Sequence, residues 1–486
     1  MAQTIRSKLL NGVVWNFIEK ILIRAASFLI GIILARLLSP SDYGLIGMLA
    51  IFISISTVFI EGGLAKALIQ RKNCQDIDFS TAFVANVGIS VVIYAIMFFA
   101  APWIAKFYDE PILKDLTRIL SLNFILGSFN VVQRAKMMAK VDFKSLAQIN
   151  VISTIVSGAV GISMAYYGCG VWALVGQTIC STVVLIILFP IYSKWRPSLG
   201  FSWTSFRQLF RYGSNLMLAG VYSVVLNNIS TICIGKYYHS KQLGYYTRAA
   251  QFSELISTTS YDVIGNVTFP VLSELQDDKT RLVEVYRKSL FFTAMVIFPV
   301  MILTALLARP LILVLLTEKW LPSVVLIQWL CLARMFTPLS AINMNILNAV
   351  GRSDLFLKLD LLKLPLYLLT FAITIPISVK AIAIGDFVST FICFFVNAYL
   401  PGRMFGYGAW KQLKDWRYVF LSLAFMVGGV LLILHFIENV WLQLFVGGFV
   451  GILIYIGCCL LFKMIDDDIL VMMKLKKVDN AGTENY

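Results

Sequence analysis

The residues best suited to chemistry are cations spaced along one long apolar stretch near the N-terminus. Within residues 13–38, Lys20 and Arg24 stand one helical turn apart. In a helix that turns about 100° per residue, five polar or small residues fall within about 80° of one another: Asn16, Lys20, Arg24, Ser27 and Gly31. Two cations at this spacing repel each other and make poor structural pairs. We therefore expect this stripe to line a wet cavity and to attract an anion.

A second polar stripe begins at Arg248 and continues into another apolar stretch. Gln251, Asp262 and Asn266 lie within about 60° of Arg248 on a helix, and Glu254 lies at about 120° from it. Arg334 is a further cation within an apolar stretch, as is Lys363. Either one pairs with Asp360 or Asp386, or extends to the membrane interface.

These residues form the candidate set for ligand binding. A charged side chain in hydrocarbon costs about 2.5–3.5 kcal/mol on insertion scales, so such groups tend to face a cavity or a partner. The predicted substrate-binding residues are Asn16, Lys20, Arg24, Arg248, Gln251, Asp262 and Arg334. The many buried amides, among them Asn123, Asn130, Asn150 and Asn343, favour hydrogen bonds from helix to helix instead.

The elements that must hold these residues are membrane-spanning helices. Fourteen apolar stretches approach the roughly 20 residues that cross a bilayer; the fourth is short. They are Val13 to Leu38, Leu45 to Leu64, Phe79 to Ile104, Ile119 to Val132, Leu146 to Tyr167, Val171 to Tyr192, Gly213 to Gly235, Ala249 to Leu272, Ser289 to Leu307, Val324 to Ala349, Leu359 to Val379, Ala381 to Leu400, Tyr418 to Ile437 and Val440 to Phe462. The predicted fold is therefore an all-α polytopic membrane protein.

The distribution of Lys and Arg predicts the orientation of these spans. With Arg36 counted in the gap after the first span, the even-numbered gaps and both termini carry 27 of the 41 cations. The odd-numbered gaps carry 10. Because short loops rich in Lys and Arg stay in the cytoplasm, both termini are expected to be cytoplasmic.

Composition excludes several classes of function. The hydrophobic fraction of 59% exceeds the roughly 45–50% of soluble domains. The net charge of +15 lies mostly in short loops, so it indicates topology and lipid contact and not nucleic acid. The eight cysteines include no C-x-x-C pair, and only two histidines are present. We expect no metal, no cofactor and no catalytic triad.

An internal repeat divides the chain. Residues 35–44 recur as residues 235–244, each with a basic residue after a helix and a glycine eight positions later, Gly44 and Gly244. Six spans separate the copies, so the two halves share one orientation, related by a pseudo-two-fold axis along the membrane normal.

The repeat leads to a division into five parts. These are a first six-helix bundle at 1–193, a basic amphipathic linker at 194–212 expected in the headgroup plane, a second six-helix bundle at 213–402, helices 13 and 14 at 403–463, and a cytoplasmic tail at 464–486.

Several segments together resemble one family, the polysaccharide transporters of the multidrug/oligosaccharidyl-lipid/polysaccharide exporter superfamily. They are spread from about residue 10 to 400, and their order is more specific than any one of them. The segments are Leu34 to Gly44, Glu61 to Arg71, Lys140 to Lys144, Tyr167 to Val175, Phe269 to Ser273 and Glu318 to Trp320.

The resemblance implies a flippase, not an enzyme, that works by alternating access. Its cargo would be an undecaprenyl-diphosphate-linked oligosaccharide moving to the outer leaflet of a bacterial plasma (inner) membrane for surface polysaccharide synthesis. It also implies a central cationic cavity for the diphosphate, at Lys20, Arg24 and Arg248 here. Membrane lipids and glycan assembly proteins such as a polymerase are the implied partners.

Three other functions remain open. A cation-coupled drug antiporter of the same superfamily needs an acidic site, which Glu61, Glu254, Asp262 and Asp386 could supply. A membrane glycan polymerase would need a large outer loop, and the longest outer gaps here are short. A structural scaffold would not explain costly buried charges.

Overall fold

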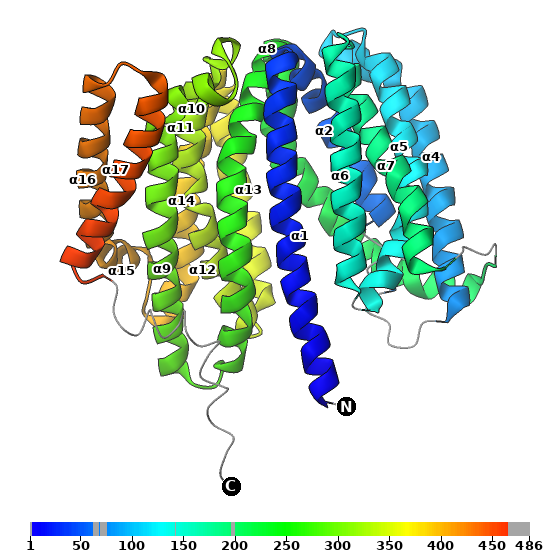
Figure 1. The fold of residues 1–486 in the computed structure, drawn as a ribbon. Coiled ribbons are helices and arrows are strands. Elements are labelled where there is room, and N and C mark those ends of the chain that lie inside the picture. The colour runs from blue at the N-terminus through cyan, green and yellow to red at the C-terminus, as the bar shows by residue number, and fades with distance from the viewer. Residues whose placement is uncertain (1, 62–67, 69–74, 141, 196–199, 465–486) are drawn as a thin grey trace. The chain divides into compact units, whose positions relative to one another are not determined.

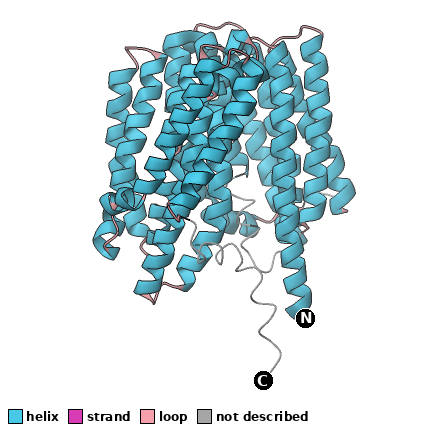
Figure 2. Cartoon of the chain, turned by 60° about the vertical axis from the view of Figure 1, so that its left-hand side comes forward, coloured by secondary structure: helices cyan, strands magenta, loops and turns pink. Residues whose placement is uncertain are grey.

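The computed structural model describes residues 2–61, 68, 75–140, 142–195 and 200–464. Within these ranges the chain forms helices and turns and no strand, as Figure 2 shows. It divides into two compact units, Met1–Thr247 and Arg248–Tyr486. The predicted all-α polytopic fold is confirmed, and each unit is described by itself below.

The described residues of the first unit form six complete helices and the first part of a seventh, α8. Helix α4 packs on α5, α6 packs on α7, and α1 packs on α6; Figure 1 labels these helices. The bounds are α1 Ala2–Leu37, α2 Pro40–Glu61, α4 Asp76–Tyr108, α5 Leu113–Ala139, α6 Phe143–Tyr166, α7 Trp172–Ser193 and α8 Trp203–Glu274.

Helix α8 is interrupted where the second repeat copy begins its turn. His239 has φ 63° and ψ 173°, so the hydrogen-bonded ladder cannot continue straight through it. The part before His239 includes residues of the predicted interfacial linker, because the helix starts at Trp203 and no other break interrupts it. The linker residues from Trp203 onward therefore lie in the first turns of α8, and their position in the headgroup plane stays a prediction.

The two repeat copies touch each other through reciprocal glycines. A side chain on Gly44 would place its Cβ 1.7 Å from the carbonyl oxygen of Ser240, and one on Gly244 would place its Cβ 1.8 Å from that of Pro40. Ser240 occupies the repeat position of Pro40, and Gly244 that of Gly44. The contact is thus pseudo-symmetric, and only glycine allows the backbones to approach this closely.

In the first unit, salt bridges connect loops that are predicted to lie on the same side of the membrane. Lys236 pairs with Asp109 at 3.1 Å, which joins two odd-numbered gaps. Lys136 pairs with Asp76 at 2.8 Å, which joins two even-numbered gaps. An alternating chain of spanning helices brings its loops together in this way.

The second unit is built around α9, α11 and α14. Its largest fully buried side chains are aromatic and include Trp320, Trp416, Phe298 and Phe394. Tyr286, Asn343 and Gln412 form a buried hydrogen-bonded cluster across three helices. The bounds are α9 Lys279–Leu306, α10 Ala308–Leu315, η1 Glu318–Trp320, α11 Ser323–Arg334, α12 Thr337–Ala349, α13 Ser353–Thr374, α14 Val379–Phe405, α15 Ala409–Asp415, α16 Arg417–Phe436 and α17 Val440–Leu461.

Nine segments of the described chain are long and apolar enough to cross a membrane. The five other predicted spans fall in α1, α5, α13 and the two parts of α8, which carry more polar residues. Large apolar side chains such as Phe99 and Trp103 are about three-quarters exposed, as expected of helices that face lipid. The exact count of fourteen spans stays a prediction.

Two predicted spans differ in detail from the helices that contain them. The fourth was expected to end at Val132, but α5 runs from Leu113 to Ala139. Its polar residues, including Ser121, Ser128 and Asn130, are buried against other helices and lower the hydropathy that marked the span. The tenth, predicted from Val324 to Ala349, is confirmed as one apolar span over Ser323–Ala349, and a short break after Arg334 divides it into α11 and α12.

The reciprocal glycine contact gives a stability prediction. Replacing Gly44 or Gly244 with alanine would place the added methyl carbon less than 2 Å from a backbone carbonyl oxygen of the other copy. Overpacking of this kind destabilises a protein by about 1–3 kcal/mol. We expect each variant to melt at a lower temperature than the wild type when purified in one detergent. Gly88→Ala is the control, since its added methyl group would meet nothing within 4 Å. Equal melting temperatures for all three variants would contradict the prediction.

Candidate functional site

Helix α1 carries the predicted cationic stripe, and its packing on α6 sets the direction of that stripe. A Cβ on Gly158 of α6 would lie 2.2 Å from Ile30, so the two helices approach closely there. The Nδ2 of Asn150 in α6 also donates to Glu19 at 2.6 Å. Glu19 and Ile30 lie within about 20° of each other around α1 and mark the face that contacts α6.

Lys20 and Arg24 lie away from that face. By helical geometry Lys20 is about 90° and Arg24 about 130° around α1 from the direction of α6. Lys20 is exposed and Arg24 is half-buried. Both make contacts within the structure. Asn16 lies in α1, but its side chain is outside the described part of the chain.

Arg248 contacts two residues of the second unit, to which it also belongs. It is buried, with 5% of its surface exposed, and its Nη1 donates to Oε1 of Gln251. Its guanidinium carbon lies 5.8 Å from the ring centroid of Trp320 in η1, within range of a cation–π interaction. Two predicted site residues, Arg248 and Gln251, are therefore in direct contact. The side chain of Asp262 falls outside the described residues.

Arg334 bridges two carboxylates of the second unit. Its Nη2 lies 3.5 Å from an oxygen of Glu254 in α8 and 3.5 Å from one of Asp386 in α14. Asp386 is buried, and a buried carboxylate needs a compensating cation. Arg334 also ends α11, where the helix dipole favours positive charge. Of the two predicted partners for Arg334, the structure selects Asp386; Lys363 instead pairs with Asp360.

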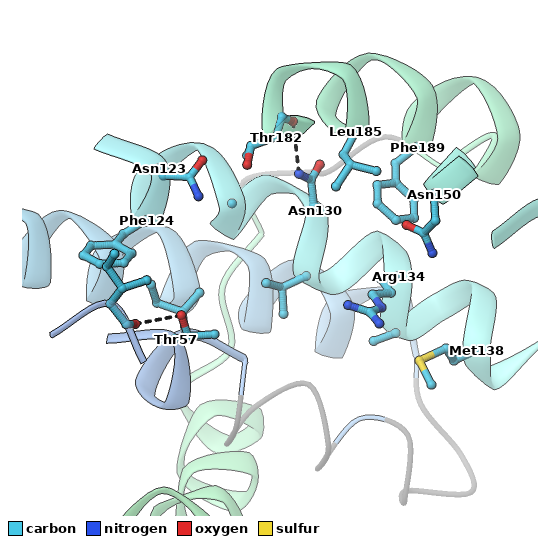
Figure 3. Close-up of a pocket in the computed structure, with 15 residues that line it drawn as sticks. Thr57, Asn123, Phe124, Asn130, Arg134, Met138, Asn150, Thr182, Leu185 and Phe189 are labelled. Atoms are coloured by element: carbon cyan, nitrogen blue, oxygen red, sulfur yellow. Dashed lines mark hydrogen bonds between the residues drawn. The ribbon is translucent and has the colours of Figure 1, made fainter. Parts of the chain in front are cut away.

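A cavity of about 340 Å³ lies within the first unit, between α2, α5, α6 and α7. Figure 3 shows Asn123, Asn130 and Arg134 of α5 along it, with Asn150 and Phe189 beside Arg134. Its volume is at the lower end of the roughly 300–1,000 Å³ of ligand pockets.

The polar atoms in this cavity are incompletely paired. Asn130 is buried and donates through Nδ2 to the Thr182 carbonyl at 3.4 Å. Among the described residues, the Oδ1 atoms of Asn123 and Asn130 have no hydrogen-bond partner. Arg134 has no carboxylate partner in that part of the chain. The cavity thus offers acceptors and one cation to a ligand.

The cation of this cavity was missed by the sequence analysis. Arg134 was counted with a cytoplasmic gap, because the fourth span was ended at Val132. Asn123, Gly127, Asn130 and Arg134 fall within about 60° on a helix, so the same periodicity that marked α1 would have found it. The amides also confirm the helix-to-helix interpretation in part, since Asn130 and Asn150 each bond another helix.

The sequence is similar to one protein family and to several characterised proteins. The profile of the family described as "Polysaccharide biosynthesis protein" matches residues 33–325. The lipopolysaccharide biosynthesis protein WzxC of Escherichia coli (strain K12) is 23% identical over 369 residues, 75% of each chain. The succinoglycan biosynthesis transport protein ExoT of Rhizobium meliloti (strain 1021) is 24% identical over 321 residues, 66% of this chain and 65% of that one.

A solved structure shares the fold. The lipid II flippase MurJ, in an inward closed conformation, superposes with a TM-score of 0.74 at 16% identity, covering 92% of this chain and 98% of that one. The likeness establishes the helical architecture that holds the cations and amides described above. Because the family profile covers more than half of the sequence, this chain belongs to the polysaccharide biosynthesis protein family.

Proposed function

We propose that the chain is a flippase, a transporter and not an enzyme, for an undecaprenyl-diphosphate-linked oligosaccharide. It would carry this lipid from the inner to the outer leaflet of the bacterial plasma membrane for surface polysaccharide synthesis. The observation that carries the proposal is the presence of cations within apolar helices of a polysaccharide biosynthesis family member. Lys20 and Arg24 are in α1, and Arg134 is in the cavity of the first unit. The names of WzxC, ExoT and MurJ support the same cargo class.

The cargo explains why such costly residues stand inside the membrane. A diphosphate joined to a glycan cannot cross about 30 Å of hydrocarbon unaided, because both groups would lose their hydration. Lysine and arginine replace that hydration with charge-assisted hydrogen bonds. We assign the diphosphate to Lys20, Arg24 and Arg248. The predicted substrate-binding set also includes Asn16, Gln251, Asp262 and Arg334.

The cavity of the first unit suits the sugar part of this cargo. Sugar hydroxyls are hydrogen-bond donors, and the Oδ1 atoms of Asn123 and Asn130 are acceptors without a partner among the described residues. The rings of Phe124 and Phe189 line the same space and supply apolar area for a sugar face. Arg134 would meet an acidic substituent or the phosphate.

Alternating access would open and close the reciprocal glycine contact. The predicted bundles at 1–193 and 213–402 meet there, through Gly44 with Ser240 and Gly244 with Pro40. Rocking of one bundle against the other would separate these four residues. The lipid-linked glycan is the proposed partner, and a polysaccharide polymerase is the partner that would receive it.

Cation-coupled antiport is a second candidate function, favoured by one observation. Glu254 and Asp386 converge on one point, as a cation site requires. The guanidinium of Arg334 lies at that point, 3.5 Å from each carboxylate. Because the guanidinium of Arg334 already neutralises part of the negative charge of these carboxylates, they would bind a transported cation more weakly. We therefore rank antiport below flipping.

The proposed function predicts that the cations of α1 are needed for export. Lys20→Ala or Arg24→Ala should lower glycan export about 10-fold or more, since charge-assisted hydrogen bonds contribute roughly 1.5–3 kcal/mol each. Arg24→Glu should be worse, and Arg24→Lys should rescue only partly because an ammonium lacks the bidentate fork. The measurement is surface glycan in a deletion strain complemented at matched membrane abundance.

The control for this prediction is Arg36→Ala on the same helix. Arg36 lies about 160° around α1 from Lys20, so its loss should leave export near the wild-type level. Wild-type glycan from Lys20→Ala, Arg24→Ala and their double mutant would show that the α1 stripe is not an anion site.

The second prediction tests rocking at the glycine contact. In a cysteine-free background, Ser41→Cys with Lys241→Cys should be joined by a short, cleavable thiol cross-linker, because neighbouring residues of the two turns touch. The cross-link should stop export, and its reduction should restore it. Each single variant treated with the same reagent is the control. Full export with the cross-link in place would refute rocking at this contact.

The third prediction concerns topology. In a cysteine-free variant of the protein expressed in whole cells, Asp109→Cys should react with an impermeant maleimide from outside, whereas Arg207→Cys and Lys411→Cys should react only after permeabilisation. The basic residues of the even-numbered gaps are the physical reason. Outside labelling of position 207 or 411 would contradict cytoplasmic termini.

A further inference from the structure

A basic pocket lies at one end of α9, α16 and α17, beside the short helix α15, and is separate from the residues proposed for transport. Figure 1 shows α16 and α17 side by side with α15 near one end of them. The pocket has a volume of about 560 Å³. Its lining is Glu284, Arg287, Lys288, Phe291, Lys414, Asp415, Arg417, Tyr418, Phe462, Lys463 and Met464.

Five cations and two carboxylates line this pocket, which leaves a net charge of +3. Arg287 forms a two-pronged contact with Asp415, at 2.6 Å and 3.0 Å. Lys288 pairs with Glu284 at 2.8 Å. Both carboxylates are therefore already engaged. Asp415 also accepts from the Tyr407 hydroxyl at 2.8 Å, and burial together with this contact raises the pKa of Tyr407.

Three cations remain without a carboxylate partner among the described residues: Lys414, Arg417 and Lys463. Arg417 stacks over the ring of Tyr418, 4.7 Å from its centroid, which orients the guanidinium without neutralising its charge. All three are exposed. Like charges held together around one concave space favour an anion that bridges them.

The pocket stands at the level where a membrane-spanning helix ends. Arg417 is the first residue of α16, and Lys463 follows shortly after the last residue of α17. The unpaired N–H groups at the start of α16 add partial positive charge. Tyr418 and Phe462 stack with centroids 5.4 Å apart and form an apolar wall next to these cations.

This combination fits the headgroup of an anionic phospholipid. Phosphate oxygens accept charge-assisted hydrogen bonds from lysine and arginine, and basic pockets between membrane helices bind such headgroups. The outward side chains of α16 and α17, such as Leu432 and Phe449, are exposed and apolar, so acyl chains can extend along the same helices. We propose that the pocket formed around Lys414, Arg417 and Lys463 binds the phosphate groups of an anionic phospholipid, of which cardiolipin is the best probe.

The test uses the full chain in nanodiscs of phosphatidylcholine to which cardiolipin is added in steps. Native mass spectrometry counts retained lipid, and thermal unfolding measures the gain in stability. The wild type should retain cardiolipin and melt at a higher temperature as cardiolipin is added. The triple variant Lys414→Gln, Arg417→Gln and Lys463→Gln should bind it about 10-fold or more weakly, the factor that about 1.4 kcal/mol produces.

The matched control removes the same charge from elsewhere in this unit. Lys380→Gln, Arg403→Gln and Lys411→Gln change two lysines and one arginine that are exposed and do not line the pocket. This variant should bind cardiolipin as the wild type does. Equal loss in both triple variants would show general charge attraction and overturn the site. Equal retention in the wild type and the pocket variant would overturn it as well.

A second arm separates a lipid from a soluble anion. Inorganic phosphate and pyrophosphate are added at millimolar concentration to the wild type in pure phosphatidylcholine nanodiscs. The proposal expects little stabilisation from either. Stabilisation equal to that by cardiolipin, and lost in the pocket variant, would overturn the assignment to a lipid. Neither arm depends on the flippase function, because binding is measured without transport.

Discussion

The absence of water from the bilayer core is the constraint on which this structure depends. Every charge within a spanning helix needs a partner, a cavity or an exit to the interface. The second unit satisfies this requirement internally: Arg334 lies between Glu254 and Asp386, and Lys363 pairs with Asp360. The first unit presents Lys20 on an exposed face of α1 and Arg134 in a cavity.

The two repeat copies contact each other at the place where the proposed rocking motion would separate the bundles. Residues 200 positions apart, Gly44 and Gly244, each pack on the backbone of the other copy. Around these two glycines the closest neighbours are backbone atoms of Ser240 and Pro40, so little side-chain packing is lost there when the contact separates. Lys236 with Asp109, and Ser240 with Glu110, hold the second copy against the turn between α4 and α5. The pair of Lys236 and Asp109 is exposed to solvent, so water can replace it.

The α5 helix shows where hydropathy alone gave the wrong answer. Its buried face carries serines and amides, so an average over the sequence fell below that of a spanning helix and the predicted end was placed at Val132. The observed helix continues to Ala139 and includes Arg134. A helix whose polar face is covered by α2, α6 and α7 needs less apolar surface than one surrounded by lipid. Asn123, Asn130 and Arg134, which lower the mean hydropathy of this helix, also line the cavity.

The sequence by itself determined the properties that depend on local composition and order. Long apolar stretches gave the all-helical membrane fold, the spacing of Lys20 and Arg24 gave the polar stripe, and the recurrence at an offset of 200 identified Gly44 and Gly244 as equivalent. Only the tertiary structure decided which distant residues meet. It selected Asp386 for Arg334, brought Asn130 next to Thr182, and gathered Lys414, Arg417 and Lys463 around one pocket. The physical reason is that helical periodicity fixes which face a side chain occupies, whereas its partner depends on how helices far apart in the chain pack together.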